Sequence, residues 1–239
     1  VTQPKEFAVS DLIDTTEMYL RTIYELIEEG VPPLRARIAE RLHQSGPTVS
    51  QTVARMERDG LLTVHGDRHI ELSAHGRELA VAVMRKHRLA ERLLVDVIGL
   101  DWASVHEEAC RWEHVISEDV ERRLVMILDQ PQTSPYGNPI PGLEALSGVA
   151  APSSFLDGVE SLTALVGPEP ASFMLRRIGE NSQTDPQTLT VLEAAGIRPG
   201  EVVQAVLDGS VVQVTGPTGV AEVATDVAEG LFVEPRQKP

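Results

Sequence analysis

The sequence predicts a mainly helical protein with a small amount of β-structure: an N-terminal winged helix-turn-helix, a central helical domain and a C-terminal small β-barrel. Three observations support this fold class. Two short helical segments separated by a break precede a hairpin pattern, residues 74–128 have long helical periodicity, and short apolar runs alternate with Gly and Pro after residue 171.

The first domain is predicted over residues 1–81. Apolar periodicity indicates a helix over 11–29, which Gly30 and the following Pro-Pro pair stop. Helices over 34–42 and 47–59 flank a break at 43–46, where Ser45 is a good N-cap. This pattern is typical of a helix-turn-helix with a Gly-containing turn. The hairpin pattern that follows has Gly66-Asp67-Arg68 at its tip and completes a winged helix.

The central domain is predicted over residues 82–148. We expect one helix over 74–99 and another over 102–128, whose apolar positions exceed what a lone helical hairpin buries and therefore predict a dimer module. The segment 134–142 contains three prolines and two glycines, so it is expected to be irregular.

The C-terminal region begins with residues 149–170, rich in Ala, Ser, Gly and Pro, which indicates a flexible tether. The last domain is predicted over 171–239. Its expected elements are strands at 173–178, 202–207, 211–214 and 231–233 and a helix near 187–195, which fit a small barrel.

Bulk properties restrict the class of protein. Hydrophobic residues make up 42% of the 239 residues, no long uncharged apolar run occurs, and the first residues lack a secretory signal, so we expect a cytoplasmic protein without membrane contact. The single cysteine, Cys110, cannot form an internal disulfide. Net charge is -15, yet residues 35–77 carry seven basic and five acidic groups against five and twelve in 149–239. Of these two regions, only residues 35–77 therefore carry an excess of positive charge that could face the phosphates of a nucleic acid.

One helical stretch carries a pattern typical of metal sites. His106, Cys110 and His114 repeat at intervals of four residues, with Glu113 beside them, so a helix stacks them on one face. His87 and Glu91 form a second i, i+4 pair upstream. Sulfur beside imidazole and carboxylate suits Fe(II), Co(II) or Ni(II), leaves Zn(II) and Mn(II) open, and is unlike the all-oxygen shell of Mg(II) or Ca(II). The alternative without a metal is a cysteine that packs in the core and a His–Glu pair on the surface of a helix.

The second helix of the helix-turn-helix carries groups suited to reading DNA. Small side chains there reach thymine methyls or base edges, and Gln pairs with adenine. The candidate base-reading residues are Ser45, Pro47, Thr48, Ser50 and Gln51. Arg35 and Arg55 are expected to grip phosphates, and Arg68 to touch the backbone or minor groove, although an exposed Arg is usually only a solvated charge.

Several stretches together resemble the diphtheria toxin repressor and iron-dependent regulator family of metal-activated transcriptional repressors. They are residues 14–24, 34–60, 84–94, 109–114 and 134–142. The resemblance implies an SH3-like C-terminal barrel and an Fe(II)-loaded homodimer that binds a palindromic operator and controls iron-homeostasis genes. Whether one or two dimers occupy an operator is left open.

The resemblance also implies two metal sites per subunit. The regulatory site would use Met18, Cys110, Glu113 and His114. The ancillary site would use His87, Glu91, His106, Glu180 and Gln183. An anion would lie on Arg88, Ser134 and Asn138, while Thr15 and Ala36 would lie against the DNA backbone. Taken alone, Met18 on an apolar helical face would be a core residue.

Three other functions compete with this interpretation. A regulator of the same family that senses manganese or another divalent metal is the nearest, and a metal-buffering or transport-accessory protein without DNA binding is the next. A metallohydrolase would need an open coordination position and a general base, and the sequence has no HExxH or nucleophile motif, so we expect no enzyme. The SH3-like domain is expected either to bind a proline-rich segment such as 134–142 or to act as a passive stabiliser.

Overall fold

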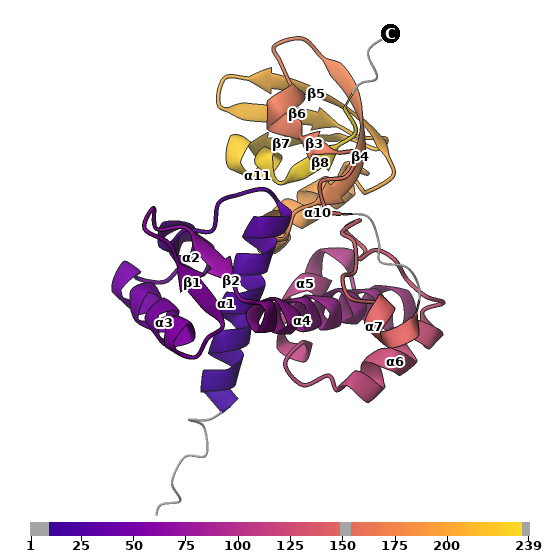
Figure 1. Ribbon diagram of the computed structural model, residues 1–239. Coiled ribbons are helices and arrows are strands. Elements are labelled where there is room, and N and C mark those ends of the chain that lie inside the picture. Colours follow the sequence, from indigo (N-terminus) through magenta and orange to yellow (C-terminus); the bar gives the residue numbers. More distant parts are fainter. Residues whose placement is uncertain (1–9, 149–153, 236–239) are drawn as a thin grey trace, which may run out of the picture. The chain divides into compact units, whose positions relative to one another are not determined.

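The computed structural model describes residues 10–148 and 154–235 (Figure 1). The chain divides into two compact units, one extending to Lys86 and the other starting at His87. The division falls inside a helix, five residues beyond the boundary predicted at 81, and the central and C-terminal domains fall in one unit. Within the described residues, no helix combines the length and apolar character needed to cross a membrane.

The first unit has the predicted winged helix-turn-helix order. Its elements are α1 (Ser10–Glu28), α2 (Arg35–Arg41), α3 (Gly46–Arg58), β1 (Leu62–Val64), β2 (Ile70–Leu72) and the first part of α4 (Ala74–Leu93). The two strands pair antiparallel, with Leu62 opposite Leu72. Tyr19 and Ile23 of α1 share a buried core with Val49 and Val53 of α3, which fixes the polar face of α3 outward.

Two turns of this unit, the one between α2 and α3 and the one between β1 and β2, have residues other than glycine at a left-handed position. His43 has φ 50° in the turn between α2 and α3, and Arg68 has φ 71° at the tip of the hairpin. The expectation of a Gly-containing turn was wrong, because Gly46 is the first residue of α3. The N-cap prediction is confirmed, since Ser45 Oγ accepts from the Thr48 N–H at 3.3 Å.

The helical part of the second unit differs from its prediction. It contains the end of α4, the π-helical turn η1 (Leu94–Ile98), the 3₁₀ turn η2 (Trp102–Ser104), α5 (Val105–Trp112), α6 (Glu118–Ile127) and α7 (Glu144–Ser147). A single helix over 102–128 was therefore wrong. Ser117 accepts from the Val120 N–H and begins α6, whose first turn is acidic, so a helix start signal lies inside the range expected to be continuous.

The C-terminal part is a six-stranded antiparallel sheet with small helices. Its elements are β3 (Glu160–Ser161), α8 (Leu162–Leu165), β4 (Ala171–Ile178), α9 (Glu180–Gln183), α10 (Pro186–Ala194), β5 (Val202–Asp208), β6 (Val211–Thr215), β7 (Val220–Ala224), α11 (Thr225–Glu229) and β8 (Leu231–Val233). The strand order is β3-β8-β4-β5-β6-β7, which fits the expected SH3-like fold. The sequence did not predict β7.

The predicted tether does not match the described part of its range. Residues 149–153 lie outside the described residues, but β3 and α8 are regular, and Phe155 and Leu162 are buried. The later part of 149–170 therefore belongs to the packed C-terminal part.

The segment 134–142 contains no helix or strand, as predicted, and packs against the end of β4. Ile178 N–H donates to Tyr136 O at 3.0 Å. Gly137 has φ 80°, and a Cβ at this position would lie 2.0 Å from Arg176 O, so only glycine fits here. This close contact fixes the start of α9, which directly follows β4.

Candidate metal centre and DNA-binding surface

Four buried side chains of the second unit converge from three helices. His87 and Glu91 lie one turn apart on α4, His106 on α5 and Glu180 at the start of α9. One ligand atom from each lies within 4.8 Å of the others, and all four residues are buried. We call these four residues the closed cluster, because one compact unit supplies all of them.

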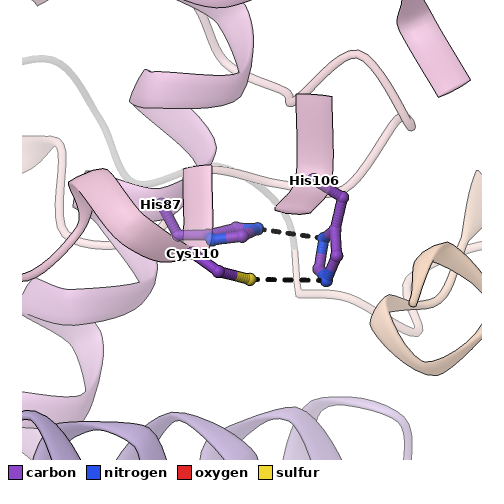
Figure 2. A group of neighbouring side chains, drawn as sticks. All are labelled: His87, His106 and Cys110. Atoms are coloured by element: carbon purple, nitrogen blue, oxygen red, sulfur yellow. Dashed lines mark hydrogen bonds between the residues drawn. The ribbon is translucent and has the colours of Figure 1, made fainter. Parts of the chain in front are cut away.

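The distances within the closed cluster are those of mutually bonded polar groups. His87 Nε2 lies 2.9 Å from Glu91 Oε1 and 3.2 Å from His106 Nδ1, and it lies 3.6 Å from Glu180 Oε2. Figure 2 shows the imidazoles of His87 and His106 joined nitrogen to nitrogen, and the two rings meet edge to face. The Sγ atom of Cys110 lies 3.7 Å from His106 Nε2. The closed cluster thus combines imidazole nitrogens and carboxylate oxygens, and the sulfur of Cys110 lies next to it.

The electrostatics of the closed cluster favour positive charge. Burial by itself raises the pKa of Glu91, but the charges and hydrogen bonds of His87 and His106 outweigh it and lower that pKa to about 2. Burial lowers the pKa of His106, yet the neighbouring Cys110 and then Glu91 raise it to about 10. For Glu180 burial is again opposed, first by Arg88, and the pKa falls below its ordinary value. A cation is therefore stabilised where these groups meet.

Three buried oxygens around the closed cluster accept no hydrogen bond from any of the described residues. They are Glu91 Oε2, Glu180 Oε2 and Gln183 Oε1. Gln183 is held by its amide nitrogen, which donates to Ile178 O at 2.7 Å. Leaving such acceptors unpaired in a protein interior is costly unless a donor or a cation satisfies them. The donor set therefore fits a divalent metal of the first transition row.

Two of the three residues expected to hold an anion, Arg88 and Asn138, are bonded to a carboxylate of the chain itself. Arg88 is fully buried, and its Nε lies 3.0 Å from Glu180 Oε1, while its Nη1 donates to Pro139 O at 2.5 Å. Asn138 Nδ2 donates to Ile178 O at 2.9 Å and lies 3.3 Å from Glu180 Oε1, and Ser134 N–H donates to Asn138 O. Glu180 is therefore fixed through one oxygen and presents the other to the imidazoles.

The set expected for the regulatory site is divided between the units. Met18 lies on α1 of the first unit, whereas Cys110, Glu113 and His114 lie in the second. Glu113 is buried, and its two carboxylate oxygens lie 2.7 Å from His87 Nδ1 and 3.4 Å from His114 Nε2. We call these four residues the split set.

The candidate DNA-binding residues all lie in the first unit. Of those around the start of α3, Ser45, Pro47, Thr48, Ser50 and Gln51 are exposed. Arg35 and Ala36 begin α2, Thr15 lies on α1, and Arg68 is exposed at the tip of the hairpin. Arg55, in the last turn of α3, donates from Nη2 to Thr16 Oγ1 at 3.3 Å. The polar start of α3 is therefore free of the core and accessible.

Two family models cover more than half of the chain. Residues 11–70 match the N-terminal DNA-binding domain of iron-dependent repressors, and residues 73–142 match the metal-binding and dimerisation domain of the same proteins. The chain belongs to the iron-dependent repressor family. Both the exposed polar start of α3 and the buried closed-cluster residues His87, Glu91 and His106 lie within the matched ranges.

Named relatives agree with this assignment. The iron-dependent repressor IdeR of Mycobacterium tuberculosis is 64% identical over 191 residues, which are 80% of this chain and 83% of the relative. The diphtheria toxin repressor of Corynebacterium diphtheriae is 53% identical over 226 residues, 95% of this chain and 99% of the relative. Among solved structures, a manganese-dependent transcriptional repressor in complex with manganese aligns with a TM-score of 0.75 at 26% identity, covering 92% of this chain and all of that one.

Sequence reasoning missed two contacts that organise the site. The bond between His87 Nδ1 and Glu113 links the closed cluster to the split set across 26 residues, and no local pattern indicates such a pairing. The ion pair between Arg88 and Glu180 spans 92 residues. Only the resemblance brought Glu180 into consideration, because its own surroundings in the sequence contain no ligand spacing.

Proposed function

We propose that this chain is an Fe(II)-dependent transcriptional repressor that binds a palindromic operator as a metal-loaded homodimer and controls iron-homeostasis genes. The observation that carries the proposal is the closed cluster: buried nitrogens and unpaired oxygens converge in the same chain as an exposed helix-turn-helix. Operator binding in turn implies a cytoplasmic location.

In this proposal the ancillary site is the closed cluster with Gln183 added. His87 and His106 supply imidazole nitrogens, and Glu91 and Glu180 supply carboxylate oxygens. Gln183 Oε1 is buried and receives no hydrogen bond from the part of the chain that the structure describes, which supports a fifth oxygen ligand. Fe(II) would be the cellular metal, with Co(II), Ni(II), Mn(II) or Zn(II) as substitutes, since this mixed donor set suits several first-row ions.

The regulatory site would be formed by the split set. Cys110 provides a thiol, His114 an imidazole and Glu113 a carboxylate already oriented by His87. The resemblance adds the thioether of Met18. Because Met18 belongs to the DNA-binding unit, ligation by all four residues would fix that unit for operator binding, and a coupling of roughly 1–3 kcal/mol per site is usual for allosteric proteins.

On the DNA, the start of α3 would enter the major groove. Ser45, Pro47, Thr48, Ser50 and Gln51 are exposed there and would face the bases. Arg35 and Arg55 would contact phosphates with Thr15 and Ala36 beside the backbone, and Arg68 would reach the backbone or minor groove. A net charge of -15 makes well-placed contacts and dimerisation necessary for useful affinity.

Dimerisation would use apolar side chains that the helical part of the second unit leaves exposed. They are Val97, Ile98, Leu100, Val115, Val120, Met126 and Ile127, of which Met126 is 68% exposed. All fall within the range that matches the metal-binding and dimerisation domain. We expect Met126→Glu combined with Ile127→Glu to weaken the dimer at least about tenfold in analytical ultracentrifugation, because each carboxylate would be desolvated in the interface. Unchanged sedimentation would show that this surface is not used.

The deciding experiment measures operator binding against metal. Metal-loaded full-length protein selects its operator from random-sequence DNA, and the selected duplex is then titrated at fixed salt with anaerobic Fe(II), Mn(II), Ni(II), Zn(II) or chelator. We expect tight binding only with metal, and the mass of the complex gives the number of dimers per operator. Equal binding with chelator would contradict the proposal.

The same titration separates the alternative functions. A manganese-responsive regulator is the second candidate, because the structurally similar repressor named above was solved with manganese; it predicts a response at lower free Mn(II) than Fe(II). A metal-buffering or transport-accessory protein predicts metal uptake without DNA affinity. Metal-dependent turnover of model esters would instead indicate a hydrolase.

A further inference from the structure

The helix that carries Met18 is bonded to the turn that precedes the recognition helix. The ring of Tyr19 is fully buried, and its hydroxyl donates to Gln44 Oε1. Gln44 directly precedes Ser45, whose side chain caps α3. This contact ties α1 to the N-terminal end of α3.

A second bond ties the same part of α1 to the other end of α3. Arg55 Nη2 donates to Thr16 Oγ1 at 3.3 Å, and Arg55 lies in the last turn of the helix. Thr16 and Tyr19 are three residues apart and therefore neighbours on α1, with Met18 in the same turn.

Apolar packing and these two bonds constrain α3 in different ways. Tyr19 and Ile23 pack against Val49 and Val53, which keeps the helices close. Apolar contacts are non-directional, so they resist separation more than a small rotation of α3 about its axis. Hydrogen bonds depend steeply on angle, and two of them near opposite ends of a helix fix its rotation. That rotation decides which side chains of α3 reach the base edges.

We propose that Thr16 and Tyr19 are positioning residues that link the turn of α1 carrying Met18 to the orientation of the recognition helix. The inference rests on the proposed function, because it takes Met18 as a metal ligand and α3 as the DNA-reading element. Arg55 then has two tasks, since one guanidinium nitrogen is committed to Thr16 while its other donors remain available for a phosphate.

The test compares hydroxyl-deleting variants of the full-length protein. Thr16→Val and Tyr19→Phe each remove one hydrogen-bonding group while keeping shape, and Gln44→Met breaks the Tyr19 bond from its partly exposed partner. Thr16→Ser restores the hydroxyl. Thr190→Val is the matched control, because its hydroxyl donates to Pro186 O within α10, far from α3 in the sequence. Metal affinity comes from competition with a fluorescent chelator, and operator affinity from fluorescence anisotropy with and without metal.

We expect Thr16→Val, Tyr19→Phe and Gln44→Met to bind metal within about twofold of wild type, yet to lose roughly tenfold in operator affinity when metal-loaded, the size of one hydrogen bond. The ratio of operator affinity with metal to operator affinity without metal should fall in the same three variants. Thr16→Ser and Thr190→Val should behave as wild type. If Tyr19→Phe fails to fold, Gln44→Met tests the same bond.

Two results would overturn the inference. One is wild-type operator affinity in the hydroxyl-deleting variants. The other is an equal loss in metal-free and metal-loaded protein, which would mean that the bonds only stabilise the unit. A wild-type protein whose operator affinity ignores metal would instead remove the proposed function, so the two failures are distinguishable.

Discussion

The closed cluster and the split set use similar ligands but differ in where those ligands come from. His87, Glu91, His106 and Glu180 meet inside one compact unit, at mutual distances below 4.8 Å. Of the split set, three members lie in that unit and Met18 lies in the other. Ligands from one unit can be arranged before a cation arrives, whereas ligands from two units can act as a switch because occupancy must bring the units into one arrangement.

One side chain belongs to both environments. His87 faces the closed cluster through Nε2, and its Nδ1 lies 2.7 Å from Glu113 Oε2. A carboxylate on the second nitrogen of a metal-binding histidine fixes its tautomer and orientation. We therefore expect the closed cluster to contribute to metal affinity, and the split set to couple metal binding to operator binding.

The largest effect is expected from Met18→Leu, which removes the thioether but nearly keeps the volume. We expect the gain in operator affinity on adding metal to fall roughly 10- to 100-fold, because the link to the DNA-binding unit is lost. Anisotropy titrations with and without Fe(II) measure this gain. Bound metal should fall from two ions per subunit to one, with an unchanged melting temperature. A retained response would remove Met18 from the split set.

Glu91→Gln tests the closed cluster with the volume conserved. The carboxylate charge that compensates His87 and His106 is lost, so metal affinity there should fall by about 10- to 100-fold. Chelator competition and metal counting after dialysis check this expectation. Glu71→Gln, at an exposed carboxylate paired with His65, is the control for removing a Glu–His pair elsewhere. Equal metal affinity in Glu91→Gln and wild type would mean that the closed cluster is only structural.

A smaller effect is expected from Gly137→Ala, which disturbs the closed cluster indirectly. The added Cβ would meet Arg176 O at 2.0 Å, so the segment 134–142 must shift away from β4. We expect a loss of about 2 kcal/mol or more, or a fall of roughly 4–8 °C in Tm by calorimetry. Gly209→Ala is the matched control, because Gly209 also has positive φ but no atom lies within 4 Å of its added Cβ. Equal losses in both would exclude the clash as the cause.

The smallest effect is expected from Asp185→Ala, which should leave both ligand sets unchanged. Asp185 caps α10 by accepting from Gln187 and Thr188, so its loss should cost about 1 kcal/mol. The Thr188 hydroxyl, followed by the Gln187 N–H, lowers the Asp185 pKa in the folded state. The stabilisation is therefore present above the unfolded pKa and fades as pH falls through the folded one. Urea unfolding at neutral and acidic pH measures this, and a difference that grows in acid would contradict the assignment.

Local signals predicted local structure well. Ser45 and Pro47 placed the start of α3, and Gly30 with two prolines placed the end of α1. The same logic failed at Ser117, a cap whose flanking apolar residues hid the break between α5 and α6. The turn between α2 and α3 was expected to contain Gly46, but Gly46 begins α3, and the left-handed residue of the turn is His43. The preference of glycine for positive φ is only statistical.

Long-range features could not be read from the residues alone. Helical periodicity placed His87 and Glu91 on one face of one helix and His106 with Cys110 on one face of another. The structure brings His87, Glu91 and His106 together. The fourth member, Glu180, joins them because the end of β4 packs against residues 134–142. That packing includes the hydrogen bond from the Ile178 N–H to Tyr136 O. No spacing rule contains such information; in this chain it came from family resemblance.

The grip of Arg88 on one oxygen of Glu180 has a consequence for cation discrimination. Since the guanidinium and Asn138 hold Oε1, the carboxylate cannot swing to follow an ion of a different radius. A rigid ligand set of this kind favours ions whose preferred bond lengths match its fixed dimensions and disfavours larger ions through strain. Ionic radius, as much as the strength of the ligands, would then decide which of the metals present in the cell binds to this chain.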